Sequence, residues 1–304
     1  FPRVADYSGV FRYWVEQCLD QTYILQPKCT HHTLEVGARY SPDSVCTPFK
    51  TALGSMIEAL DLGADTLVMS HGLCRLGYYG ELMEQILRDL GYQFEFVNFA
   101  AYSTGRSKDL LKGVKQLAPK MKAARFLTHV MDGVKMCAYI DDITSKYYQN
   151  CGFDPSGTYR AAFKRFLRAM DMVHSRPEID EAYREASYAF AQAPLDKPER
   201  PLRVGVVGEF FTVMDAFSNL DLEQTLADMG VEVHRWMNVS NRIFHYPGEK
   251  NLNVEIRDLC TYEMGPTSTA TIWAARKYAR RGFDGLIHVK SAACTPEIDV
   301  MPVL

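Results

Sequence analysis

The 304-residue sequence has little excess charge of either sign and no long apolar run. Lys and Arg together number 34 and Asp and Glu 37, so the formal net charge is −3. This balance gives no whole-chain attraction to nucleic acid or to an anionic lipid surface. A membrane-spanning helix needs about 18 or more consecutive apolar residues, and the sequence has no such run. We therefore predict a globular protein that binds neither nucleic acid nor a membrane.

Cysteine is also sparse: the chain has eight, irregularly spaced and without a Cys-x-x-Cys pair. A disulfide-stapled scaffold is therefore excluded, and the spacing favours a reducing compartment, with the cytoplasm as the expected location. The sequence likewise lacks a P-loop, and no complete Gly-x-Gly-x-x-Gly follows a strand-like segment. A built-in ATPase or dinucleotide site is not supported.

The length is that of two domains at about 150 residues each. The best linker runs from Pro194 to Pro201, because its three prolines fix the backbone and remove hydrogen-bond donors. We place an N-terminal α/β domain with a helical insertion at 1–193 and a C-terminal α/β domain at 202–304, with the linker at 194–201. Residues Pro296 to Leu304 resemble the opening of a helix, so we expect the C-terminal domain to be truncated.

Short apolar runs bounded by glycine alternate with helix-like segments in both halves, which is typical of an α/β fold with parallel strands. We predict strands at Asp65–Met69, Phe94–Val97, Arg203–Gly208, Val231–Val233 and Gly285–Val289, and an extended Tyr23–Leu25. We predict helices at Val10–Leu19, Pro48–Leu60, Glu81–Leu90, Tyr159–Val173, Ile179–Ala191, Asn219–Met229 and Thr267–Arg281. The mostly helical stretch from Ser107 to Ala191 is the insertion in the first domain. The fold class is α/β, with two Rossmann-like, doubly wound domains.

A weak internal repeat places a cysteine beyond a strand in each half. In each, a helix, a Gly-x-Asp turn and a buried strand precede a cysteine, Cys74 in the first half and Cys294 in the second. The tripeptide Cys-Thr-Pro also occurs twice, beginning at Cys46 and Cys294, and each copy is expected to open a helix. Ligands of open α/β sheets bind beyond the carboxyl ends of the strands, which is where Cys74 and Cys294 are predicted to lie.

The surroundings of these three cysteines favour a thiolate, the form that ligates metal. Proline near the first helical position leaves Cys46 and Cys294 at helix N-termini, where the helix dipole stabilises negative charge. A cation also accompanies each cysteine: Lys50, Arg75 or Lys290. A free cysteine is, however, commonly a small buried hydrophobe, and separations of 28 and 220 residues match no local zinc or ferredoxin spacing.

Four segments in order carry a family resemblance that spans nearly the whole chain. They are Tyr40–Lys50, Cys74–Glu81, Asp215–Asp221 and Cys294–Glu297. They resemble the 2-hydroxyacyl-CoA dehydratase D-component superfamily, above all its uncharacterised branch related to CoA-enzyme activases. The resemblance implies a 4Fe-4S cluster held between Rossmann-like domains by one cysteine from each of three loops. Position by position, these ligands are Cys46, Cys74 and Cys294.

The resemblance also implies a reaction and partners. An ATP-hydrolysing activase with an actin-like fold would supply low-potential electrons for reductive or radical dehydration of an acyl-CoA in anaerobic metabolism, and the protein would be a dehydratase-like lyase or a reductase component. A dimer is also considered. Two alternatives stay open: a non-catalytic electron-transfer or accessory subunit, and a zinc-binding α/β protein in which His71 joins the three cysteines. The run Ser70–Cys74 lacks the extra cysteine of many relatives, which disfavours a double-cubane cluster.

Other candidates have ordinary structural explanations beside the functional ones. Glu209 follows a predicted strand and is a candidate catalytic acid or base, although helix capping explains it equally well. Seven basic residues against one acidic residue between Arg106 and Arg125 would suit a partner or the phosphates of CoA, or form a solvated face. Cys29–His32 is interpreted as a polar loop near a strand end. The remaining cysteines are assigned to packing: Cys18, Cys137, Cys151 and Cys260.

Overall fold

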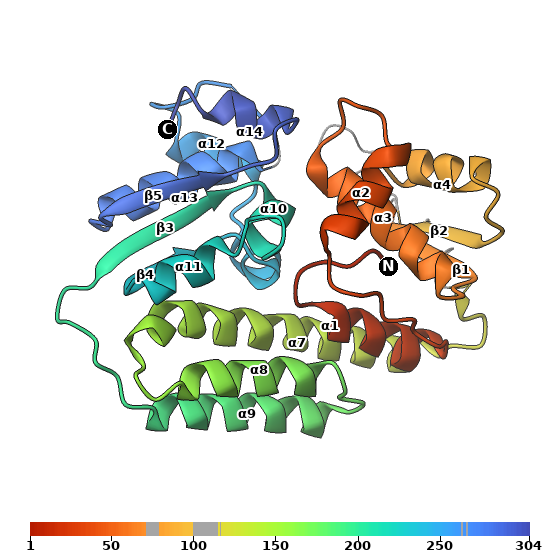
Figure 1. The fold of residues 1–304 in the computed structure, drawn as a ribbon, viewed down its shortest axis with the longest axis horizontal. Coiled ribbons are helices and arrows are strands. Elements are labelled where there is room, and N and C mark those ends of the chain that lie inside the picture. Colours follow the sequence, from red (N-terminus) through yellow and green to blue (C-terminus); the bar gives the residue numbers. More distant parts are fainter. Residues whose placement is uncertain (71–78, 100–114, 116, 263, 266) are drawn as a thin grey trace. The chain divides into compact units, whose positions relative to one another are not determined.

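The computed structural model describes residues 1–70, 79–99, 115, 117–262, 264–265 and 267–304 (Figure 1). Within these residues it is a mixed α/β structure with two short sheets, one of two strands and one of three, in which the paired strands are all parallel. The predicted α/β class is therefore confirmed. Over the described ranges, no helix combines the length and the apolar character needed to cross a membrane. Cys74, His71 and part of the basic segment 106–125, namely residues 106–114 and 116, lie outside these ranges.

Two compact units make up the chain, and each draws on several segments. The first unit comprises Phe1–Val4, Phe11–Val130 and Ser291–Thr295, and the second comprises Ala5–Val10, Met131–Lys290 and Pro296–Leu304. The predicted linker, 194–201, lies within the second unit. A division of the chain into domains at that linker stays a prediction.

The first unit contains a βαβ arrangement, which follows a long helix along the chain. Its described elements are η1 (Trp14–Cys18), α2 (His31–Tyr40), α3 (Thr47–Asp61), β1 (Thr66–Ser70), α4 (Tyr79–Asp89) and β2 (Glu95–Phe99). Strands β1 and β2 pair in parallel from Thr66 opposite Glu95 to Ser70 opposite Phe99. The predicted helices and strands of this region are confirmed to within about two residues, the usual uncertainty of element ends.

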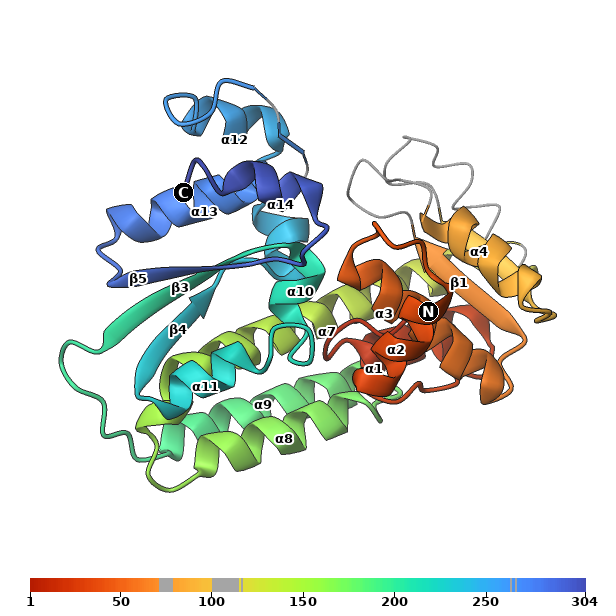
Figure 2. The ribbon, with the colours of Figure 1, turned by 45° about the horizontal axis from the view of Figure 1, so that its top comes forward.

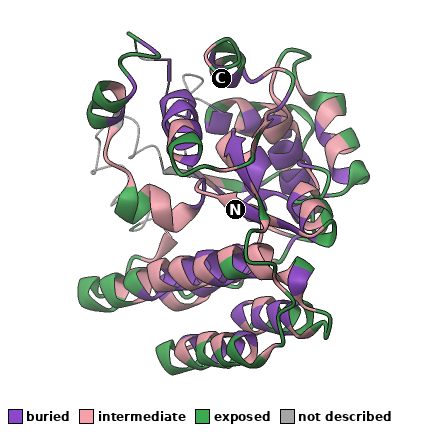
Figure 3. Ribbon diagram, turned by 90° about the vertical axis from the view of Figure 1, so that its left-hand side faces the viewer, coloured by how far each residue is buried: buried purple, intermediate pink, exposed green. Residues whose placement is uncertain are grey.

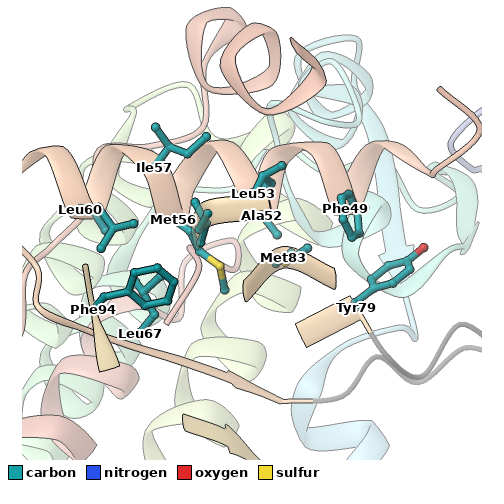
Figure 4. Close-up of a cluster of buried hydrophobic side chains, with 12 residues drawn as sticks. Phe49, Ala52, Leu53, Met56, Ile57, Leu60, Leu67, Tyr79, Met83 and Phe94 are labelled. Atoms are coloured by element: carbon teal, nitrogen blue, oxygen red, sulfur yellow. The ribbon is translucent and has the colours of Figure 1, made fainter. Parts of the chain in front are cut away.

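The core of this unit forms between α3, β1, α4 and the residues before β2. Leu53, Met56 and Met83 are fully or almost fully buried, and Leu67 and Phe94 close the cluster from the sheet side (Figure 4). These side chains recur at helical spacing on α3, which is why this sequence forms a helix with one strongly apolar side.

Helix α2 packs on α3 by close backbone contact at two glycines. A Cβ atom on Gly37 would lie 1.8 Å from the carbonyl oxygen of Lys50, and one on Gly54 would lie 1.9 Å from that of Thr33. The prediction of a polar loop at Cys29–His32 is wrong here, because Thr30 caps α2 through a capping box with Thr33. The predicted extended segment at Tyr23–Leu25 belongs to no strand.

The second unit holds a three-stranded parallel sheet in the order β4-β3-β5. Its strands are β3 (Leu202–Gly208), β4 (Val231–Arg235) and β5 (Gly285–Val289). Its helices are η2 (Cys151–Phe153), α8 (Thr158–Met170), α9 (Arg176–Gln192), α10 (Phe210–Met214), α11 (Leu222–Asp228), η3 (Asn241–His245), α12 (Glu249–Glu255), α13 (Ser268–Arg280) and α14 (Thr295–Val300). Three of the described helices cross the division between the units: α1 (Ser8–Tyr13), α7 (Ala123–Asn150) and α14, whose first residue, Thr295, belongs to the first unit.

Helices cover both faces of this sheet, with α13 on one side and α11 on the other (Figures 1 and 2). The long helices α7, α8 and α9 carry alternating bands of buried and exposed residues, as expected for helices with one packed side (Figure 3). The predicted strands and helices are all present, including the helical stretch that lies in the sequence between the strands of the two sheets.

Glycine permits the close approach of β3 to its neighbours. A Cβ on Gly205 would lie 2.5 Å from the ring of Tyr278 on α13, and one on Gly208 would lie 1.9 Å from the carbonyl oxygen of Val289. Gly208 also has a φ of +138°, which side chains other than glycine rarely adopt. Gly205 therefore allows α13 to pack closely on the middle of β3, and the carboxyl edge of β3 and β5 depends on Gly208.

Candidate functional site

Both Cys-Thr-Pro tripeptides open helices, as predicted. Cys46 is the N-cap of α3, with extended backbone angles, and its carbonyl accepts from the amide of Phe49 at 3.1 Å. Its side chain makes no capping hydrogen bond to the backbone, so the thiol is not used to close the helix. Cys294 directly precedes α14, and its amide donates to the carbonyl of Ser291 at 3.2 Å.

The segments that carry Cys46 and Cys294 lie next to each other within the first unit. The amide of Thr47 donates to the hydroxyl of Ser291 at 3.2 Å, although 244 positions separate the two residues. Thr47 follows Cys46, and Ser291 precedes Cys294 by three positions in a turn. Cys46 and Cys294, which are remote in the sequence, are therefore brought to one region of the structure.

Each tripeptide is followed by a fully buried side chain that fixes its helix. Phe49 follows the first, and Glu297 follows the second. The Glu297 carboxylate accepts from Thr271 Oγ1 at 3.1 Å and lies 2.8 Å from His288 Nε2. A buried carboxylate needs such partners, because burying it alone would be costly. Glu297 therefore anchors the start of α14, within the second unit.

The Cys46 sulfur contacts a tyrosine that opens the next helix. Tyr79 Oη lies 2.9 Å from Cys46 Sγ, and the Tyr79 ring packs edge-to-face on Phe49 at a centroid distance of 4.9 Å (Figure 4). Tyr79 is only 8% exposed, whereas Cys46 is partly exposed, so the contact is partly buried. The sequence analysis identified the cysteine but not this hydroxyl as its neighbour. Tyr79 follows the undescribed segment 71–78, which contains Cys74.

Two of the three predicted cluster ligands can thus be placed, Cys46 and Cys294. Cys74 lies outside the described residues, as does His71. Among the residues that the structure does describe, no group of three or more His, Cys, Asp or Glu side chains could hold a metal ion. Two thiols at neighbouring helix starts are nevertheless chemically suited to an iron-sulfur cluster, whose protein ligands are cysteine thiolates.

Glu209 acts as the N-cap of α10. Its two carboxylate oxygens accept from the amides of Phe211 at 3.0 Å and Thr212 at 2.7 Å, and the Thr212 hydroxyl adds a third bond. Burial raises the pKa of Glu209 above its usual range, with these hydrogen bonds opposing the shift. The capping explanation is confirmed, and an acid or base role for Glu209 stays a prediction.

The cysteines assigned to packing lie mostly inside the fold. Cys18, Cys137 and Cys260 are buried, and Cys151 is partly buried. Burial raises the pKa of the Cys137 thiol and, to about 11, that of Cys151, so both thiols stay protonated at neutral pH. These side chains therefore behave as small apolar groups.

Comparisons with known proteins do not assign the chain to a family. No family model matches the sequence, and no curated protein matches it significantly.

Proposed function

We propose that this protein binds a 4Fe-4S cluster through Cys46, Cys74 and Cys294 and belongs with the 2-hydroxyacyl-CoA dehydratase subunits it resembles. The observation that carries the proposal is the hydrogen bond between Thr47 and Ser291, which joins the two Cys-Thr-Pro turns. A chance pair of identical tripeptides has no reason to meet in space. The support for Cys74 as a ligand is indirect: Tyr79, five residues further along the chain, contacts the Cys46 sulfur.

The residues in this region suit such a cluster. Once bound, it would supply one-electron chemistry at low potential. Tyr79 would donate its hydroxyl proton in a hydrogen bond to the Cys46 sulfur, and hydrogen bonds to ligating sulfurs are one of the factors that set a cluster's potential. Phe49 packs edge-to-face on the Tyr79 ring and so helps to hold the hydroxyl near the sulfur. Ser291 fixes the loop before Cys294 by accepting from Thr47.

The wider proposal follows from the family resemblance. Electrons would come from an ATP-dependent activase with an actin-like fold, and the substrate would be an acyl-CoA that undergoes reductive or radical dehydration. Both sheets would be cores of Rossmann-like domains, and the protein would work in the cytoplasm of an anaerobic cell. An accessory electron-transfer subunit is the alternative that keeps the cluster but removes the catalysis.

Iron and sulfide analysis of protein purified without oxygen tests the cluster. We expect about four irons per chain and a broad absorption near 400 nm, the composition and charge-transfer band of a 4Fe-4S centre. Serine variants of Cys46, Cys74 and Cys294 should each lose iron. The matched controls, Cys18→Ser and Cys260→Ser, should keep it. Colourless protein with one zinc, or equal iron loss in all five variants, would contradict the proposal.

A second experiment separates catalysis from electron carriage. The cluster-loaded protein is mixed with an activase, ATP, a reductant and a panel of 2-hydroxyacyl-CoA thioesters, and dehydrated products are sought by mass spectrometry. Product formation that requires ATP supports the dehydratase. Reduction of the cluster without turnover of any thioester supports the accessory subunit.

A further inference from the structure

The hairpin formed by α8 and α9 in the second unit presents two rows of opposite charge to solvent. Helix α8 carries four basic residues and no acidic residue, whereas α9 carries four acidic residues and two arginines. Four exposed side chains form the rows, Arg165 and Arg168 on α8 and Glu181 and Glu185 on α9. Residues three or four positions apart share one side of a helix, so each pair forms a row along its helix.

Both rows lie on the side of the hairpin that faces away from α7. The opposite side of each helix is occupied by stacked rings: Phe163 of α8 lies on Tyr147 of α7 with a centroid distance of 4.2 Å, and Tyr183 of α9 lies on Tyr139 of α7 at 3.9 Å. At 3.6 residues per turn, each charged residue is about 140–160° around its helix from the ring that faces α7. Figures 1 and 2 show the two helices side by side.

The two rows also stand at the same level of the hairpin. Tyr159 of α8 stacks on Phe190 of α9 with a centroid distance of 4.1 Å, which aligns the antiparallel helices at this point. Arg168 and Glu181 are each nine positions from that stacked pair, and the other two charged residues are six and five positions from it. One face of the hairpin therefore has a basic half and an acidic half at matching heights.

These charges are mostly not used within the chain. Arg165, Arg168 and Glu185 form no ion pair with any residue that the structure describes. Glu181 pairs with Arg184 of its own helix, and both of these side chains are more than half exposed. Exposed ion pairs of this kind contribute little to stability. The rows are therefore available for a contact outside the chain.

Apolar side chains continue both rows. Met172, just after α8, is 67% exposed and lies four positions beyond Arg168. Tyr188 on α9 is 69% exposed and lies three positions beyond Glu185. Arginine, methionine and tyrosine are the exposed residues that protein interfaces favour, and tyrosine often anchors them. The face therefore combines the composition of an interface with an alternation of charge.

We propose that two copies of this chain pair through this face, with α8 of each copy lying on α9 of the other. A two-fold axis that runs parallel to the helices and between them places each basic row on the acidic row of the second copy at the same level. Arg168 then meets Glu181 of the second copy, and each contact occurs twice. A two-fold axis across the helices would place like charges together, so the charge pattern selects one arrangement.

A second copy is the occupant that uses both rows. A partner with one sign of charge would match one row and be repelled by the other. The face is only two helices wide and rich in charge, so we expect a reversible dimer at the small end of protein interfaces. Its stability should depend on salt, because the contacts lie close to solvent.

Analytical ultracentrifugation of the full chain tests the proposal. At an ionic strength of about 0.01 M, wild type should pass from monomer to dimer between about 1 and 100 μM, the affinity expected for a small interface. Raising the salt to about 1 M shortens the screening length from about 30 Å to about 3 Å and should weaken the dimer about tenfold or more.

Charge reversal tests the arrangement of the two copies. Arg168→Glu and Glu181→Arg should each weaken the homodimer about tenfold or more, because each places like charges together at two contacts. An equimolar mixture of the two variants should form a heterodimer about as strong as the wild-type dimer, since both contacts again join opposite charges. Lys250→Glu makes the same change of charge on α12, at the far end of the same unit (Figures 1 and 2), and should dimerise as wild type does.

Two results would overturn the proposal. One is wild type that stays a monomer over the whole concentration range, which means that this face is solvated or meets a different partner. The other is a dimer that both charge-reversal variants leave unchanged or that their mixture fails to restore, which places the contact elsewhere. Circular dichroism confirms that the variants are folded, and the result does not depend on an iron-sulfur cluster, because the readout is the mass of the particle.

Discussion

At the residue scale, one side chain that accepts hydrogen bonds from backbone amides determines the structure at the end of β3. Glu209 directly follows β3, and its carboxylate satisfies two amides at the start of α10 that have no partner within the helix. Its own amide donates to the carbonyl of Val289, which extends the pairing of β3 and β5 by one residue. One side chain therefore both continues the sheet and begins the next helix.

Replacement of Glu209 by Gln should change how stability depends on pH. Burial raises the pKa of Glu209, so the folded state holds its proton more tightly than the unfolded chain does. The stability that this group contributes is present below its unfolded pKa of about 4.3 and is lost as pH rises through the folded pKa. Wild type should therefore lose unfolding free energy relative to Glu209→Gln as pH rises, measured by urea denaturation at several pH values.

Glu232→Gln is the control with the opposite sign. Partial burial acts to raise the pKa of Glu232. Hydrogen bonds and charges from Lys197 and His234 outweigh this effect and hold that pKa below its usual range. Wild type should gain unfolding free energy relative to this variant as pH rises from acid toward neutral. Parallel pH profiles for the two glutamine variants would show that the carboxyl of Glu209 is not perturbed by its surroundings.

At the element scale, several described helices end at a glycine with positive φ, and two of these turns carry the Gly-x-Asp pattern of the expected internal repeat. Gly63 follows α3 with a φ of +95°, and Gly282 follows α13 with a φ of +68°. The next residue in each case donates back to a carbonyl five residues earlier, Ala64 to Ala59 at 3.0 Å and Phe283 to Tyr278 at 3.2 Å. This is the Schellman pattern that glycine permits. Each turn then leads through an aspartate into a parallel strand.

Alanine at two glycines of the first unit should have different costs for different reasons. At Gly63 nothing lies within 4 Å of the added methyl, so only the positive φ is penalised, at about 1–2 kcal/mol. At Gly54 the methyl would meet the Thr33 carbonyl of α2, and the two helices would have to separate. The cost there should be about 3 kcal/mol, at the upper end for overpacking. Chemical denaturation of both variants measures the difference, and equal costs would contradict the close helix contact.

The sequence predicts the strands and most helices, because apolar runs between glycines and helical spacing are local signals. It misses α2, whose first residues are His31 and His32 and whose interior holds Gly37, all unfavourable for recognition as a helix. The pair Thr30 and Thr33, which caps that helix, was the available local signal. The repeated tripeptide predicts that Cys46 and Cys294 each precede a helix, and both do; their role as ligands stays a prediction.

The remaining features depend on contacts between distant segments. A small polar cavity is lined by Asp141 on α7 and Arg235 on β4, and Tyr79 meets Cys46 across 33 positions. No local pattern marks these residues, because a tyrosine or an aspartate at such positions is equally compatible with exposure to solvent. Only the folded arrangement of the elements shows which of them are buried together.

At the scale of the whole molecule, neither compact unit is a continuous piece of the chain. The first unit takes Ser291–Thr295 from the far end of the sequence, and the second takes Ala5–Val10 from the beginning. A cut at the predicted linker would separate partners inside both units. It would remove Ser291 from Thr47 in the first unit, and Gln224 from Tyr147 in the second, where the hydrogen bond measures 2.6 Å.

Fragments 1–193 and 194–304, expressed separately, should therefore not fold independently. Each fragment lacks part of the buried contacts of both units. Fragment 194–304 also lacks the helix α7, whose Asp141 accepts a hydrogen bond from the amide of Ser240. We expect broad, non-cooperative thermal transitions by circular dichroism and poorly dispersed NMR spectra for each fragment alone, and a cooperative transition when the two are refolded together. Sharp transitions in both isolated fragments would instead support two autonomous domains that meet at the proline-rich segment. The first fragment lacks only Ser291–Thr295 of the first unit, whereas the cut divides the second unit between the two fragments, so this comparison tests chiefly whether the second unit folds only as a whole.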